Sequence, residues 1–98
     1  MLKHYVFFKY EEGFLNDEKI AEMKAVFDAV CRDVQGALSY KITKNAIERD
    51  ANMDLMVTMK LSDEAALFSY LSHDEHVAIG KRYAPHIKKI FSFDETGM

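Results

Sequence analysis

The chain has 98 residues, 49% of them hydrophobic, which suits one folded domain with one core over residues 1–98. Its formal net charge of -3 arises from 13 basic and 16 acidic residues that are interspersed, so we expect no basic surface for nucleic acid. The single cysteine, Cys31, excludes an intrachain disulfide, and a reducing, cytoplasmic setting is therefore expected.

The first half of the chain reads as strand, helix and strand. Residues 3 to 10 alternate between apolar and polar, as a strand does, and are too polar for a secretory signal or a membrane span. From residue 17 to 35, apolar residues recur every three or four positions, which predicts an amphipathic helix capped by Asn16 or Asp17 and closed by Gly36. A second strand follows, with an apolar side formed by Leu38, Tyr40 and Ile42.

The second half begins with the clearest strand and continues into an interrupted helix. Residues 53 to 61 alternate strictly between the two sides of a strand. Ser62 or Asp63 can cap the helix that follows. The run Ser72-His73-Asp74 breaks the helical pattern, and a second helical piece continues to about Tyr83.

The end of the chain completes a ferredoxin-like pattern. Pro85 stops the helix, a last strand is expected from about His86 to Phe93, and the tail from 94 to 98 is expected to fray. Two strand-helix-strand units joined without a further helix predict an α+β fold in the order β-α-β-β-α-β. We therefore expect a four-stranded antiparallel sheet with both helices on one face.

The opposite face of this sheet is mostly polar but retains a group of apolar residues. Aromatic clusters on an open sheet face are usually covered, and a second copy of the chain is the simplest cover. The alternative is that these residues are scattered and tolerated in solvent. The group consists of Tyr5, Phe7, Met56 and Phe91 or Phe93.

Several segments resemble the stress-responsive A/B-barrel (Dabb) family, and together they cover nearly the whole chain. They are the opening LKHYVFFKY, the Asp-Glu helix start, the strand MDLMVTMKL and the segment ALFSYLSHDEHVAI, which contains a Y-x-x-H-x-x-H run. The resemblance implies a ferredoxin-like protomer and a homodimer whose sheets pack face to face into a dimeric α+β barrel.

The resemblance also suggests candidate site residues. A plant polyketide cyclase of this fold uses a Tyr and a His for an aldol-type ring closure, and the matching positions are Tyr70 and His76. The chain departs from the pattern twice. Asp74 stands where members commonly have Pro, and Leu55 stands where the cyclase has a His, which makes the expected pocket more apolar.

The residues themselves indicate how such a site could form. His4 shares a strand face with Val6 and should point toward the helices. Tyr70 and His76, six positions apart, converge only if the helix breaks between them. The chemistry predicted for this trio is proton abstraction beside a carbonyl, with His76 as the base and Tyr70 as a hydrogen-bond donor. The ligand-binding residues expected around them are His4, Leu55 and His73.

Each candidate also has a plain structural interpretation. A histidine beneath a helix is more often a bonded core residue, His73 suits a helix start, and Tyr70 could simply pack in the core. A metal site at His73 and His76 lacks a third ligand, so neither a metal nor a cofactor is expected. Three hypotheses stay open: a barrel that binds a small apolar or aromatic molecule, a cyclase or isomerase, and a structural dimer with a filled pocket.

Overall fold

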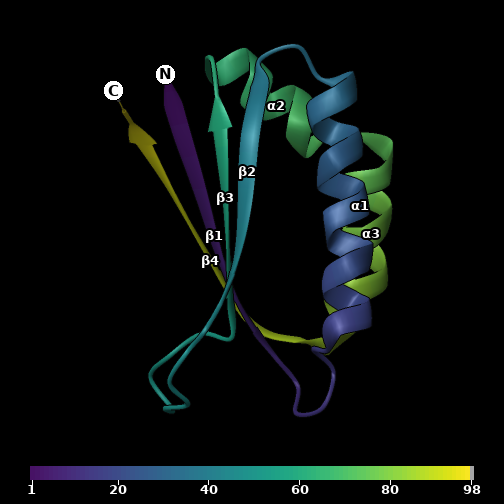
Figure 1. The fold of residues 1–98 in the computed structure, drawn as a ribbon, viewed down its shortest axis with the longest axis vertical. Coiled ribbons are helices and arrows are strands. Elements are labelled where there is room, and N and C mark those ends of the chain that lie inside the picture. Colours follow the sequence, from purple (N-terminus) through teal and green to yellow (C-terminus); the bar gives the residue numbers. More distant parts are fainter. Residues whose placement is uncertain (98) are drawn as a thin grey trace.

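The computed structural model describes residues 1–97 and has one sheet with all its helices on one side (Figure 1). The strands are antiparallel and lie in the order β2-β3-β1-β4. The predicted ferredoxin-like architecture is confirmed, with the second helix divided in two. The elements are β1 (Leu2–Tyr10), α1 (Asp17–Asp33), β2 (Ala37–Lys44), β3 (Leu55–Leu61), α2 (Glu64–Leu71), α3 (Asp74–Tyr83), the 3₁₀ turn η1 (Ala84–His86) and β4 (Ile87–Thr96).

Helix α1 begins at a side-chain cap and ends before a glycine turn. The Asn16 side-chain oxygen accepts a hydrogen bond from the Lys19 amide at 2.8 Å, which caps the helix as predicted. The helix ends at Asp33, two residues earlier than expected. Gly36 has a φ of 92°, and a Cβ built there would lie 2.3 Å from Oγ of Ser62. The close passage of this turn over the end of β3 therefore requires glycine.

The predicted break in the second helical segment is confirmed. Helix α2 ends at Leu71, and α3 begins at Asp74. The Ser72 hydroxyl donates back to the Phe68 carbonyl at 2.9 Å, which satisfies an acceptor at the end of α2. None of the described helices is long and apolar enough to cross a membrane.

Strand β2 contains a bulge that overturns one prediction. Ala37 pairs with Leu61 and Ser39 with Lys60, so Leu38 is an extra residue in the ladder. Leu38 is 51% exposed, whereas Ala37 occupies the buried position. The expectation that Leu38 shares the apolar side of this strand with Tyr40 and Ile42 was wrong, because simple alternation does not reveal an inserted residue.

Strand β4 runs farther than predicted. It continues to Thr96, and Asp94 lies opposite His4 on β1. The start of β1 and the end of β4 consequently lie side by side in Figure 1. The expectation of a frayed tail was wrong for residues 94 to 96, while Met98 lies outside the described residues. Pairing with β1 orders this segment, and that contact joins residues 90 positions apart.

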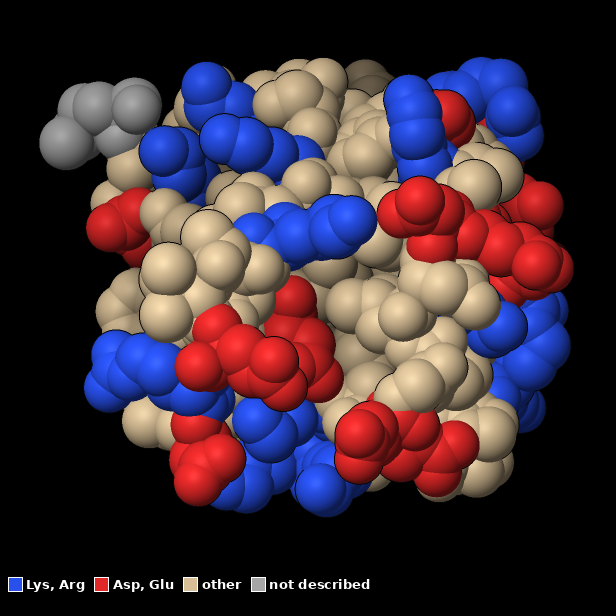
Figure 2. Space-filling model, turned by 60° about the horizontal axis from the view of Figure 1, so that its bottom comes forward, with Lys and Arg blue, Asp and Glu red and all other residues tan. Residues whose placement is uncertain are grey.

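The two faces of the sheet differ in what covers them. The helix-covered face carries buried core residues, including Val57, Met59 and Leu61. On the bare face, Tyr5 lies opposite Phe93 and Phe7 opposite Phe91, so both aromatic residues of β4 belong to the group expected there. Elsewhere on the surface, acidic and basic side chains are interspersed, as Figure 2 shows for one side of the molecule.

Candidate functional site

A cavity of about 670 Å³ lies between the sheet and the helical layer. Residues of β1, β3 and β4 form one wall, and residues of the three α-helices form the other. Most of the lining is aliphatic or aromatic. The side chains that bring polar atoms to it are His4, Tyr10, Tyr70, His76, Tyr83 and Ser92.

His4 reaches this cavity from β1 and is held by Asp94. Its ring is almost fully buried, and Nδ1 lies 2.5 Å from a carboxylate oxygen of Asp94. An ionised carboxylate only accepts hydrogen bonds, so Nδ1 carries the hydrogen here. The neutral form of His4 therefore keeps Nε2 as an acceptor. Asp94 was missed as a site residue because the sequence placed it in a frayed tail, although it continues the alternation of β4.

Tyr70 and His76 meet across the break between α2 and α3. Their ring centroids are 4.6 Å apart, and the Tyr70 ring also meets the His4 ring in an edge-on arrangement, with centroids 5.8 Å apart. Tyr70 is buried, and its hydroxyl has no hydrogen-bond partner among residues 1–97. The structure thus brings together three of the five residues that the sequence proposed for a site.

The protonation states of this pair follow from their burial. Burial lowers the pKa of His76, and the positive charges that His4 and His73 can carry lower it further, against a hydrogen bond to the Leu71 carbonyl that raises it. Nδ1 of His76 makes that bond at 3.4 Å, which leaves Nε2 as an acceptor. Burial raises the pKa of Tyr70 above its ordinary value, so its hydroxyl keeps its proton. At neutral pH the pair offers one acceptor and one donor.

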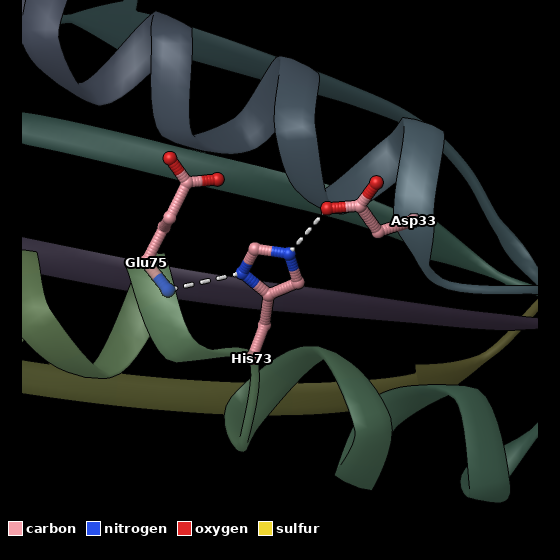
Figure 3. Close-up of side chains that lie close together, drawn as sticks. All are labelled: Asp33, His73 and Glu75. Atoms are coloured by element: carbon pink, nitrogen blue, oxygen red, sulfur yellow. Dashed lines mark hydrogen bonds and ion pairs between the residues drawn. The ribbon is translucent and has the colours of Figure 1, made fainter.

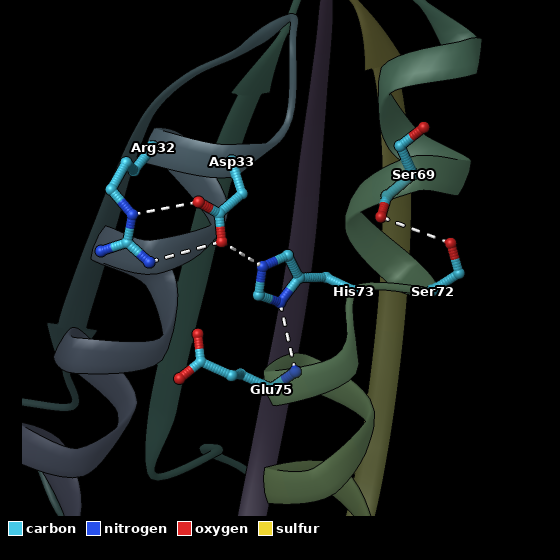
Figure 4. Close-up of polar contacts among 6 residues, drawn as sticks. All are labelled: Arg32, Asp33, Ser69, Ser72, His73 and Glu75. Atoms are coloured by element: carbon cyan, nitrogen blue, oxygen red, sulfur yellow. Dashed lines mark hydrogen bonds and ion pairs between the residues drawn. The ribbon is translucent and has the colours of Figure 1, made fainter.

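His73 lies outside this cavity and points toward the end of α1 (Figure 4). Its Nδ1 accepts a hydrogen bond from the Glu75 amide at 3.2 Å, and its Nε2 donates to Asp33 at 2.9 Å. The bond from His73, with a second from Arg32, lowers the pKa of the Asp33 carboxyl. His73 therefore caps α3 and connects it to α1.

The same contacts account for a cluster that resembles a metal site. One donor atom each from Asp33, His73 and Glu75 lies within 4.8 Å of the others. Both ring nitrogens of His73 are already engaged, however, and Figure 3 shows that Glu75 is joined to the ring through its backbone amide. The helix cap explains the arrangement without an ion.

Leu55 also lies away from the cavity. It is 2% exposed on the covered face of β3, where it belongs to the hydrophobic core. It borders a separate depression beneath the connection between β2 and β3, together with Phe7 and Met56. Leu55, which was expected to make the pocket apolar, therefore belongs to the hydrophobic core next to the cavity.

Comparisons with known proteins identify the family and the fold. A family model described as the stress responsive A/B barrel domain matches residues 2–96, and the chain belongs to this family. No curated protein matches the chain.

Three solved structures illustrate the likeness. A dimeric ferredoxin-like protein of unknown function from Jannaschia sp. CCS1 is 20% identical, with a TM-score of 0.81 over 98% of each chain. A Dabb family protein with a ferredoxin-like fold from Mesorhizobium loti is 19% identical, with a TM-score of 0.74 over 99% of this chain and 96% of that one. Hydroxynitrile lyase from Passiflora edulis is 14% identical, with a TM-score of 0.73 over 96% of this chain and 90% of that one. At these identities the likeness concerns the fold alone.

Proposed function

We propose that this stress responsive A/B barrel protein binds a small apolar or aromatic molecule that carries a carbonyl or hydroxyl group. The observation that carries the proposal is the cavity of about 670 Å³, with largely apolar walls and three polar side chains gathered at one place. Small-molecule sites commonly have this size and this composition. An open space of this kind also counts against a purely structural dimer whose pocket is filled by its own side chains.

The polar side chains supply complementary hydrogen-bonding groups. The Tyr70 hydroxyl is neutral and has no partner among the described residues, so it is free to donate to a carbonyl oxygen. His76 offers Nε2 as an acceptor for a ligand hydroxyl. His4 is oriented by Asp94 on the neighbouring strand β4. A ligand with a single polar group would be held at this place, with its apolar part along the remaining wall.

A binding experiment with small ketones tests this proposal. We expect aryl and alkyl methyl ketones to shift the NMR signals of amides around the cavity. Tyr70→Phe should weaken binding about fivefold, because one neutral hydrogen bond is lost. Tyr40→Phe is the matched control, since the Tyr40 hydroxyl bonds to Asp28 outside the cavity. If no ketone at millimolar concentration shifts these amides, the proposal is wrong.

A second candidate function is proton abstraction beside the bound carbonyl, as in a cyclase or isomerase. The favouring observation is that neutral His76 lies against protonated Tyr70, with ring centroids 4.6 Å apart. Nε2 of His76 would take a proton from the carbon next to the carbonyl, and Tyr70 would stabilise the oxygen that gains charge. The lyase from Passiflora edulis is an enzyme with a similar fold.

Isotope exchange separates the enzyme from the binding protein. If His76 is a base, the protein should speed the exchange of the ketone's α-protons for deuterium, and His76→Ala should reduce that rate by at least about a hundredfold. His86→Ala is the control, because His86 lies outside the cavity, beside Glu11. Saturable binding with no exchange above the solvent rate would exclude this second candidate and leave the first.

We also propose that the protein is a homodimer in which two bare sheet faces meet. The support is the row of aromatic residues on the bare face, exposed on β4 and half-buried on β1, and the description of the Jannaschia protein as dimeric. Exposed apolar patches of this kind are typical of protein interfaces. The cytoplasmic location expected from the single cysteine stays a prediction.

A further inference from the structure

The cavity has a second polar end that the proposed function does not use. Its wall follows β1 from His4 to Tyr10, which lie six positions and about 20 Å apart in an extended strand. Val6 and Phe8 lie between them on the same face. Apart from Ser92, which lies opposite Val6, an apolar stretch therefore separates the end with His4, Tyr70 and His76 from an end near Tyr10 and Tyr83.

The Tyr10 side chain is buried but its hydroxyl is unpaired. Tyr10 is 4% exposed, and its ring packs between Phe8 and Phe14, with centroids 5.6 and 5.3 Å away. No hydrogen bond to its hydroxyl occurs within residues 1–97, although its backbone amide donates to Asp54. Buried tyrosine hydroxyls usually find a partner.

The hydroxyl of Tyr10 belongs to a residue that lines the cavity, and its oxygen is not fully enclosed. Among the described residues, Oγ1 of Thr43 is the one side-chain polar atom that is fully enclosed and has no partner. The Tyr10 oxygen has no partner either, so it must retain some accessible surface. Tyr83 offers no equivalent free donor, because its single hydroxyl hydrogen is donated to Glu22, with the Lys19 carbonyl 3.3 Å from the same oxygen. The free hydrogen-bonding group at this end is therefore that of Tyr10.

The surroundings of Tyr10 favour an uncharged partner. Burial raises the pKa of Tyr10, so the hydroxyl keeps its proton and can both donate and accept. The cavity lining, as far as residues 1–97 form it, contains no lysine or arginine that could neutralise a carboxylate. A hydroxyl, an ether or a carbonyl is consequently the kind of group that suits this end.

We propose that the cavity binds an elongated molecule with an uncharged polar group at each end. A carbonyl lies at the end formed by His4, Tyr70 and His76, a hydroxyl, ether or second carbonyl bonds to Tyr10, and an apolar chain or ring joins them. The inference rests on the proposed function and specifies its ligand class. An entirely apolar tail would leave the Tyr10 hydroxyl without a partner in the complex.

A series of matched ketones tests the second contact. The probes are straight-chain methyl ketones of about six to fourteen carbons, each compared with an analogue in which the far methyl group is replaced by a hydroxyl. At the length that spans the cavity, the hydroxyl should tighten binding about fivefold or more. Tyr10→Phe should reduce that advantage to less than about twofold, because the phenyl ring cannot form a hydrogen bond to the hydroxyl of the probe. Isothermal titration calorimetry measures both affinities.

The controls distinguish this inference from the function on which it rests. Tyr40→Phe should keep the preference for the hydroxylated probe, because Tyr40 lies outside the cavity lining. Binding of plain ketones with no gain from the hydroxyl at any length, or a gain that persists in Tyr10→Phe, would overturn the inference alone. Failure of every probe to bind the parent protein would overturn the proposed function as well.

Discussion

Both faces of the sheet carry large apolar side chains, but the surroundings of these side chains differ. On the covered face, Met59 is fully buried, whereas Phe91 and Phe93 on the bare face are 57% and 62% exposed. Even the covered face is incompletely covered, since Ile90 of β4 faces the helices and is still 57% exposed. Alternation thus assigns a residue to a face, but only the packed helices decide whether that residue is buried.

Two methionine variants on β3 should give the largest difference between the faces. Met59→Ala should lower the free energy of unfolding by about 2 to 5 kcal/mol, because it leaves a cavity in a packed core. Met56→Ala, on the bare face, should cost the monomer less than about 1 kcal/mol. Urea unfolding at low protein concentration measures both. Equal losses would mean that the bare face is as well packed as the core.

A charge on the bare face should separate the proposed dimer. Phe93→Asp buries a carboxylate between the two sheets, so we expect the mass in sedimentation equilibrium to fall to that of a monomer. Circular dichroism should stay unchanged. Phe68→Asp is the matched control, because Phe68 is 59% exposed on α2, in the helical layer. A dimeric mass for the Phe93 variant, or a monomeric parent at micromolar concentration, would contradict the face-to-face arrangement.

Neighbouring acidic residues near the end of β4 should differ in importance. Asp94 bonds to buried His4 on the covered side, and Glu95 accepts a hydrogen bond from Tyr5 on the bare side. Asp94→Asn should lower the free energy of unfolding by about 1 kcal/mol. This loss is smaller than for a fully buried hydrogen bond, because Asp94 is partly exposed. Glu95→Gln should cost less than about 0.5 kcal/mol. If both variants lost a similar free energy of unfolding, His4 would be exposed to solvent in the working protein.

The smallest expected effect is a pH dependence of the free energy of unfolding, which arises from His76 on the covered side of the sheet. Its pKa in the folded protein lies below the ordinary value of 6.5, mainly because the ring is buried. The unfolded chain therefore binds more protons than the folded chain between these two pKa values. The contribution of His76 to stability is complete above pH 6.5 and falls as the pH is lowered through that window.

Imidazole NMR and unfolding measurements test this dependence together. The titration midpoint of His76 should lie below 6.5, and His76→Gln should lose part of the decline in stability at acidic pH. The neighbouring side chains whose positive charge lowers the pKa of His76 are His4 and His73. The titration of His76 is therefore also measured in His73→Ala. A midpoint above 6.5 in the parent would show that the ring is not buried as described.

Much of the candidate site could be inferred from local patterns. The alternation of β1 directed His4 toward the helices, and the break at Ser72-His73-Asp74 allowed Tyr70 and His76 to meet. Local patterns indicated that His73 suits a helix start, but they did not exclude it from the site, because both histidines fit the same short run. Only the position of Asp33 on α1 gives His73 a partner outside the cavity.

The sequence by itself determined the order of elements, the side of each strand and the helix break. These features depend on spacings of two to four residues and on caps formed within one turn of a helix. The tertiary structure decided the bulge at Leu38, the pairing of Asp94 with His4, and the cavity that reaches from His4 to Tyr10. Each of these arises where segments distant in sequence pack together, and strand register and helix position are set by that packing.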